Sequence, residues 1–377
     1  MSWDDAPADA ASTARRALRI CNACGYCNGF CDVFEAAKRR RNLTDLDLAH
    51  LANLCHACRN CLYGCQYASP HPFAVNIPQG LALVRYQSYV NYAWPRALSV
   101  LFAHSVTAAL TLGFGAISVV MGLTLALVPP EILFAPQRGP GAFYRVVPWE
   151  VMLWLGMLPL GWSILAVGIS LRRFWRSTGT HQAPISAGAI MTALHDILVL
   201  RNLSGGGPGC NDVDDRFSHR RRWFHQTMVA GFLLSLASTT TASLYHHVLD
   251  WEAPYPLLSL PVLLGTVGGI AMAVAAAGLV LLKRQSDPQA TASETLGADY
   301  ALLSLLFTVA VTGLALLVLR ETAAMGLLLA AHLGNVLALF LLIPYSKFVH
   351  AGYRSVALLH DAMERRHAGA RFDNNNL

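Results

Sequence analysis

Two groups of cysteines near the N-terminus share a spacing that suits iron chemistry. The first group is Cys21, Cys24, Cys27 and Cys31, and the second is Cys55, Cys58, Cys61 and Cys65. Both read C-x2-C-x2-C-x3-C, the spacing with which bacterial two-cluster proteins hold [4Fe-4S] clusters. The two groups therefore predict two clusters and one-electron transfer.

The fourth cysteine of each group is expected to cross to the other cluster, as it does in two-cluster ferredoxins. The first predicted ligand set is Cys21, Cys24, Cys27 and Cys65, and the second is Cys55, Cys58, Cys61 and Cys31. This arrangement predicts two clusters close enough for electrons to pass between them.

A disulfide framework and a zinc site are the alternatives to these clusters. Disulfides need an oxidising compartment, and the opening residues MSWDDAPADA contain no apolar signal-peptide core. Zinc takes four ligands, usually from two short hooks, which two four-cysteine groups exceed. The pattern favours iron–sulfur clusters.

The surroundings of the cysteines indicate a helical domain. Neither group continues with the proline usual in small β-type ferredoxins. Residues 43–54 carry leucines at helical spacing, and Thr44 or Asp45 can cap their start. We expect residues 1–96 to form an all-helical, cytoplasmic two-cluster domain.

The composition changes after residue 96, and the rest of the sequence indicates a membrane domain. The chain is 54% hydrophobic and 13% charged, with a mean hydropathy of +0.42. Six charge-free stretches each reach the roughly 20 apolar residues that cross a bilayer. They are residues 97–130, 151–171, 223–249, 253–282, 300–319 and 322–346. The predicted fold is all-α, with the two-cluster domain followed by a six-helix transmembrane bundle.

Basic residues predict the orientation of that bundle. With the cysteine domain in the cytoplasm, only Arg138, Arg145 and Arg320 of the 28 lysines and arginines face outward, as the positive-inside rule expects. We therefore predict a multi-pass protein of the bacterial inner membrane with both termini cytoplasmic. The net charge of +6 reflects this bias, and no basic–aromatic stripe indicates a nucleic-acid partner.

The domain boundaries follow from these spans. The membrane domain is expected at residues 97–350, with a cytoplasmic loop at residues 172–222 and a cytoplasmic tail at residues 351–377.

Histidines within the apolar stretches indicate haem. His332 and His350 are eighteen residues apart, which on one helix returns to the same face about 27 Å further along. We expect His225 and His350 to hold an inner b-type haem, and His332 to hold an outer one with His246 or His247. The alternative is unliganded histidines at helix ends, which suits His332 least because it lies deep in its stretch.

The predicted cytoplasmic loop contains two further features. Its residues 187–201 place Ile190, Met191, Leu194, Ile197 and Leu198 on one helical face, which suits a helix on the membrane surface. Residues 204–210, SGGGPGC, match neither nucleotide-binding glycine motif and indicate a tight turn packed against the cluster domain or a partner. Cys210 is interpreted as a free structural thiol.

Four features together resemble the tricarballylate/citrate utilization protein B family, over residues 21–366. They are the paired cysteine groups, ALHDILVLRNLSGGGPGC (193–210), RRRWFHQTMVAGFLLSLASTTTASLYHH (220–247) and IPYSKFVH (343–350). The membrane module also resembles the cytochrome-like half of a cobalamin-pathway flavohaemoprotein. Its last helix resembles the haem-binding gamma subunit of nitrate reductase.

The resemblance implies a membrane electron acceptor in tricarballylate utilization. Its expected partner is a cytoplasmic FAD-dependent dehydrogenase that converts tricarballylate to cis-aconitate, and its expected acceptor is quinone in the membrane. His332 and His350 match the paired haem ligands of the nitrate reductase helix, and the Tyr-His pair favours His246, with His247 as the alternate ligand.

The chain has no residue that suits substrate-level catalysis, and it lacks the glycine fingerprint of a flavin-binding unit. We therefore expect an electron-transfer subunit of an oxidoreductase system rather than a stand-alone enzyme. The basic run at residues 38–41 is a solvated face or a docking site for the flavoprotein. The alternatives are an iron–sulfur redox sensor or membrane anchor, and a quinol-driven reductase subunit of the heterodisulfide type.

Overall fold

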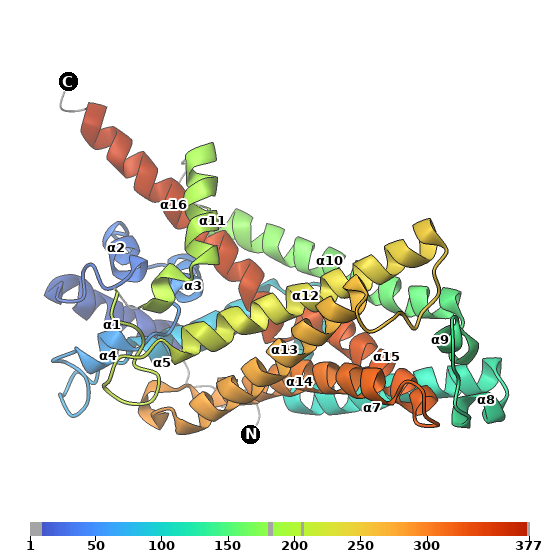
Figure 1. Ribbon diagram of the computed structural model, residues 1–377. Helices are drawn as coiled ribbons and strands as arrows, with labels where there is room; N and C mark the ends of the chain where they lie inside the picture. The colour runs from blue at the N-terminus through green and yellow to red at the C-terminus, as the bar shows by residue number, and fades with distance from the viewer. Residues whose placement is uncertain (1–9, 180–183, 205–206, 375–377) are drawn as a thin grey trace.

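The structure is a computed structural model that describes residues 10–179, 184–204 and 207–374. Over these ranges the only regular elements are helices, and the single isolated bridge pairs Cys210 with Ser218. The predicted all-α class is therefore confirmed. Figure 1 shows short helices gathered at one end and long helices running away from them.

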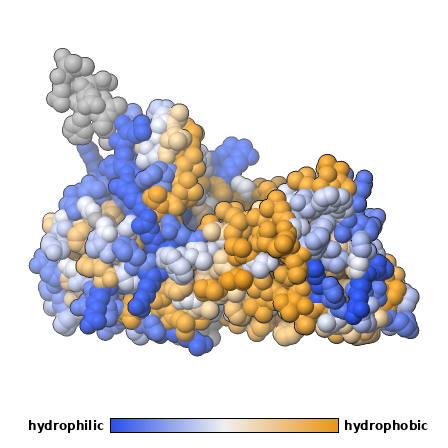
Figure 2. Space-filling view, viewed as in Figure 1, coloured by the Kyte–Doolittle hydropathy of each residue, from blue (hydrophilic) through white to orange (hydrophobic). Residues whose placement is uncertain are grey.

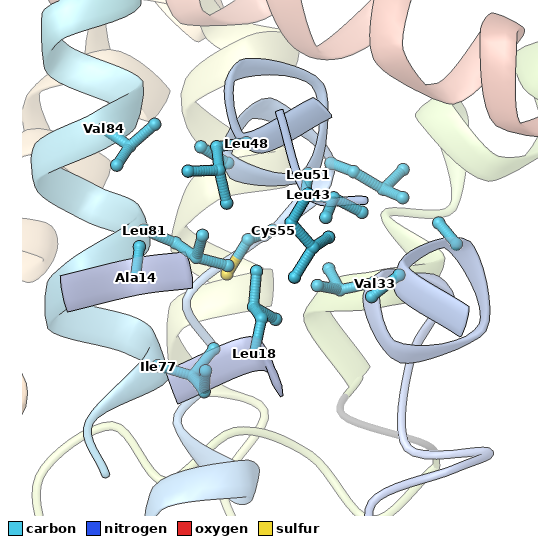
Figure 3. Packing of buried hydrophobic residues seen from close by; sticks show 14 of the residues in the cluster. Ala14, Leu18, Val33, Leu43, Leu48, Leu51, Cys55, Ile77, Leu81 and Val84 are labelled. Atoms are coloured by element: carbon cyan, nitrogen blue, oxygen red, sulfur yellow. The ribbon is translucent and has the colours of Figure 1, made fainter. Parts of the chain in front are cut away.

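The short N-terminal helices pack around an apolar core. They are α1 (Ala10–Cys24), α2 (Asp32–Lys38), α3 (Asp45–Leu54), α4 (Asn60–Tyr63) and α5 (Ile77–Tyr92). Leu18, Leu51 and Leu81 are fully buried in this core, and Figure 3 shows Cys55 beside them. Thr44 caps α3 by accepting a hydrogen bond from the Asp47 backbone amide, so the predicted cap is confirmed.

Within the described part of the chain, six helices are long and apolar enough to cross a membrane. They are α7 (Ser105–Leu127), α10 (Trp149–Thr178), α12 (Arg220–Leu249), α13 (Leu260–Gln285), α14 (Leu296–Leu319) and α15 (Met325–Leu342). Half of the most apolar window of α15 is buried, against 11% for α12. The helix α15 therefore lies inside the bundle, and α12 lies at its edge. Figure 2 shows the apolar surface along these helices.

The helices α12 and α13 approach closely through glycines. A side chain at Gly231 would meet the Gly268 carbonyl oxygen at 2.8 Å, and one at Gly268 would meet the Ser235 backbone nitrogen at the same distance. Small residues at such crossings let two membrane helices pack backbone to backbone.

The structure corrects two predicted spans. The first span was expected to begin at residue 97, but the chain leaves helical geometry at His104, after η2 (Arg96–Ser99) and α6 (Val100–Ala103). His332 and His350 were expected to lie on one last helix, which is wrong, since they lie on α15 and α16. The chain continues after α15 through η6 (Ile343–Tyr345), extended Ser346 and η7 (Lys347–Val349) before α16 (His350–Asn374) begins. Proline in η6 removes a backbone donor at this break.

The helix α16 occupies the residues expected as a tail. It packs against α3 and α11 (Ala187–Leu198). Arg39 pairs with Asp361 and, at 3.3 Å, with Glu364, and Arg40 pairs with Glu364 at 2.8 Å. The middle of the basic run at residues 38–41 is thus engaged within the chain. Residues 375–377 lie outside the described ranges.

The remaining connections lie at the two ends of the bundle. They are α8 (Pro130–Phe134), α9 (Ala142–Val146), η3 (Arg201–Ser204), η4 (Pro288–Ala290) and η5 (Ser293–Thr295). Figure 1 shows α8 and α9 at the end opposite the cysteine helices, and α11 and α16 at the cysteine end. The helix α11 ends at Leu198 rather than at residue 201 and stands across the direction of the long helices (Figure 1).

Candidate metal centres

The first cavity of the N-terminal domain is lined by four cysteines. They are Cys21, Cys24, Cys27 and Cys65. The first two lie in the last turns of α1, and a turn through Gly25, with φ of +68°, leads to Cys27. Glycine suits this left-handed conformation. Cys65 follows α4 and comes from the second sequence group, so this cavity joins both groups.

The second cavity is lined by the other four. They are Cys31, Cys55, Cys58 and Cys61. Cys31 precedes α2, Cys55 follows α3, and Cys61 lies in α4. Between them the backbone is left-handed at Ala57 and Arg59, which folds the loop around the cavity. The two cavities divide the cysteines into the crossed sets that their spacing predicts.

The thiols of these cavities disfavour ionisation in the metal-free state. Burial, and then the neighbouring thiols, raise the pKa of Cys21 to about 12 and that of Cys27 to about 11. Burial likewise raises the pKa values of Cys31 and Cys61 well above the usual range. Iron binding needs thiolates, so a metal must displace these protons.

The donor sets fit a cluster better than the alternatives. All nine cysteines are free of disulfides. Within the described ranges no three His, Cys, Asp or Glu side chains converge closely enough to hold a single metal ion. The sulfurs instead surround cavities in fours, which is the donor number of a cubane.

The glycine-rich loop packs against the second cavity. The Asn211 backbone amide donates to the Cys58 carbonyl at 3.0 Å, and the Asn60 side chain donates to the Gly209 carbonyl at 3.1 Å. Cys210 is buried and its thiol donates to the Leu203 carbonyl. The described part of the loop therefore packs against the cluster domain, as expected, while Gly205 and Gly206 lie outside the described residues.

The sequence interpretation missed Asn202, which lines the second cavity. It also donates to the Asp32 side chain at 2.9 Å. The nearby glycine-rich motif was the available signal, since it marked this segment as packed.

One of the predicted histidine pairs meets in the structure. The rings of His225 on α12 and His350 on α16 have their centres 6.0 Å apart and are nearly perpendicular, at 84°. Metal–imidazole bonds are about 2 Å long, so two rings on opposite sides of one metal have centres about 6 Å apart. The spacing therefore fits a bis-histidine site.

The surroundings of the two Nδ1 atoms are consistent with a bis-histidine site that uses Nε2. His350 Nδ1 lies 2.6 Å from the Lys347 carbonyl oxygen, and a backbone acceptor there leaves Nε2 as the free lone pair. Burial, followed by the nearby charge of Arg354, lowers the pKa of His350 well below its usual range, which favours the neutral ring. His225 Nδ1 is buried without a partner.

The other predicted pair does not meet. His332 Nδ1 lies 3.1 Å from Thr312 Oγ1 of the neighbouring helix α14. The His246 ring stacks on Trp149 with centres 4.2 Å apart, and the His247 ring contacts the same indole at 5.1 Å. Among the described contacts, none joins His332 to His246 or His247.

Comparisons with known proteins agree with this architecture. The family model for citrate utilization protein B matches residues 103–371, and the model for its Fer4-like domain matches residues 14–91, which contain both cysteine groups. Citrate utilization protein B of Escherichia coli is 42% identical over 357 residues, covering 93% of this chain and 92% of that protein. No solved structure matches the chain. The chain belongs to the citrate utilization protein B family.

Proposed function

We propose that this protein transfers electrons from a cytoplasmic FAD-dependent dehydrogenase of the tricarballylate type to quinone in the bacterial inner membrane. The observation that carries the proposal is the division of eight cysteines between two four-sulfur cavities at the end of a six-helix membrane bundle. The family membership supports the same function.

The residues that would hold the redox groups are the ones described above. Cys21, Cys24, Cys27 and Cys65 would hold one [4Fe-4S] cluster, and Cys31, Cys55, Cys58 and Cys61 the other. His225 and His350 would hold an inner haem b, while an outer haem at His246 and His332 stays a prediction. When bound, these groups supply one-electron transfer, which divides the two electrons of a reduced flavin.

The two cavities differ in solvent access, which supports electron transfer from the first cavity to the second. Cys24 is exposed, and Tyr26 beside it is 64% exposed, so a soluble partner can approach the first cavity. Cys55 and Cys58 are buried. Arg354 on α16 and Arg221 on α12 donate to backbone carbonyls of the second cysteine loop, residues 55–61. These two helices also carry the paired histidines. The second cavity therefore faces the membrane domain.

The deciding experiment combines membranes containing this protein, the FAD-dependent dehydrogenase, tricarballylate and a quinone analogue. Quinone reduction should require every component and should be lost in Cys24→Ser. The matched control is Cys210→Ser, which alters a thiol outside both cavities. Anaerobically purified protein should also contain about eight non-haem irons with matching sulfide, since each cubane holds four.

Two results would contradict the proposal. Purified protein that contains zinc and no sulfide would exclude the clusters. Equal quinone reduction by the dehydrogenase without this chain would exclude the relay and would favour the sensor or anchor.

A further inference from the structure

Arginines flank the paired histidines at one level. Arg221 precedes His225 by four residues on α12, and Arg354 follows His350 by four residues on α16. Residues four apart lie on the same face of a helix, one turn from each other. The helix α12 starts at the cysteine end, and α16 runs towards it (Figure 1). Each arginine therefore lies one turn closer to the cysteine loop than its histidine does.

Both side chains end on that loop without meeting a carboxylate. Arg221 Nη1 donates to the Ala57 carbonyl at 2.7 Å, and Arg354 Nη2 donates to the Cys55 carbonyl at 3.0 Å. Carbonyl oxygens accept hydrogen bonds but carry no charge to balance a guanidinium. Neither arginine forms a salt bridge within the ranges that the structure describes.

Arg85 on α5 adds a third positive charge. It is only 8% exposed, and its Nε and Nη2 atoms are buried without a hydrogen-bond partner. Burial, followed by the charge of Arg85, lowers the pKa of Arg354 to about 10. Hydrogen bonds also connect the two residues, since Arg354 Nε donates to the Asn53 carbonyl at 3.4 Å, the Asn53 amide donates to Ser88 Oγ, and Ser88 Oγ donates to the Arg85 carbonyl.

One further donor nearby is unpaired, and of the nearby acids Asp212 accepts from the Arg221 backbone amide at 3.4 Å while Asp299 is held by lysines. The Tyr89 hydroxyl is buried without a hydrogen-bond partner. The Asp299 carboxylate lies close enough to Tyr89 to contribute, after burial, to its raised pKa. This carboxylate already pairs with Lys283 and Lys347. Buried donors and charges without acceptors are costly. The gathering of buried donors and positive charges in one place indicates an anionic ligand.

We propose that Arg85, Arg221 and Arg354 form a buried site for the two propionate carboxylates of the haem held between His225 and His350. This inference rests on the inner haem of the proposed function. Arginine presents a planar fork of N–H donors that matches a carboxylate in two-pronged fashion. None of the three arginines lines either cysteine cavity, which favours propionates over the cluster as the anion.

The test compares haem b with its dimethyl ester, in which both propionate charges are removed. Full-length protein from haem-deficient cells, in membranes, is titrated with each compound and followed by its Soret and α-band absorbance. The wild type should bind haem at least about tenfold more tightly than the ester, since hydrogen bonds to charged groups are the strong ones. Arg85→Gln and Arg354→Gln should weaken haem binding by about tenfold and leave ester binding unchanged. Arg85→Lys should restore part of the loss.

A stability measurement separates this site from a structural role of Arg85. Removing an unpaired buried charge should leave the thermal midpoint of haem-free Arg85→Gln equal to or above that of the wild type, whereas the haem-loaded variant should melt below the haem-loaded wild type. Arg138→Gln, which changes an exposed arginine at the opposite end of the bundle, is the matched control and should change neither affinity nor midpoint.

Three outcomes would contradict the propionate site. Equal binding of haem and ester by the wild type overturns the propionate site and leaves the haem itself intact. Retained discrimination in the variants, together with a changed cluster potential or iron content, overturns it in favour of the cluster as the anion. Absence of haem binding by the wild type overturns the inner haem of the proposed function and this site with it.

Discussion

Burial in the folded protein strongly suppresses the ionisation of the cysteine thiols. Their ordinary pKa is 9.0, and burial raises it to about 12 at Cys21 and about 11 at Cys27. A raised pKa means that the folded state retains protons that the unfolded chain releases, so this contribution to stability is present below pH 9 and is lost as the pH rises through 11 to 12.

Metal-free protein in detergent should therefore show a falling thermal midpoint between pH 9 and pH 11. Its thiols should also react slowly with iodoacetamide near pH 7, because the thiolate is the reactive form. Protein with its clusters assembled is the control and should show neither trend. A midpoint independent of pH over this range would contradict the buried-thiol argument.

The paired histidines give a second prediction at the residue scale. Because the rings of His225 and His350 face each other at 6.0 Å, His225→Ala and His350→Ala should remove the same b-type α-band from dithionite-reduced membranes. His332→Ala should spare that band and remove a second one only if an outer haem exists. Loss of different bands in the two paired variants would show that these histidines do not share a haem.

Single residues also show what spacing along the chain can predict. The cysteine sets expected from spacing line the two cavities, because short, regular gaps bring thiols to one place, and their binding of clusters stays a prediction. The pairing of His246 with His332 depended on two helices meeting at one depth, which no local pattern encodes.

Elements differ in how far their packing could be predicted. The six spans followed from apolar length alone, and the α3 cap followed from a local hydrogen bond. The docking of α16 could not be predicted in this way, since Arg39 meets Asp361 across 322 positions of the chain. The break after α15 depends on a proline and an extended serine within an otherwise apolar stretch.

The helix α11 gives a prediction at the element scale. Ala189 and Ala193 pack against α16, whereas Met191 and Leu198 are 66% and 74% exposed. Since α11 stands across the long helices (Figure 1), this face can lie in the membrane interface. A photoreactive residue placed at Met191 or Leu198 should cross-link to lipid in native membranes. The same residue at Tyr26, exposed near the first cavity, should not, and equal labelling at all three positions would contradict this placement of α11.

The whole molecule is polar at the cysteine end and apolar along the bundle, as Figure 2 shows. Exposed aromatic residues interrupt the polar end, with Tyr26 64% and Phe73 42% exposed. Exposed aromatic residues beside the first cysteine cavity suit a protein interface.

We expect Tyr26→Glu to raise several-fold the dehydrogenase concentration needed for half-maximal quinone reduction. The iron content and the maximal rate at saturating dehydrogenase should stay unchanged. Leu46→Glu, which changes an exposed residue of α3, is the matched control. An unchanged concentration dependence in Tyr26→Glu would place the docking surface elsewhere.

The ion pairs between α2 and α16 bear on how the protein is made. A ribosome releases the cysteine helices first, yet Arg39 and Arg40 meet Asp361 and Glu364 only after all six apolar helices have been synthesised. The Cys55 carbonyl likewise waits for Arg354. The contacts that close the second cysteine loop therefore form late in synthesis, and we expect a nascent chain stalled before α16 to insert into the membrane with its cysteine loops open to proteases.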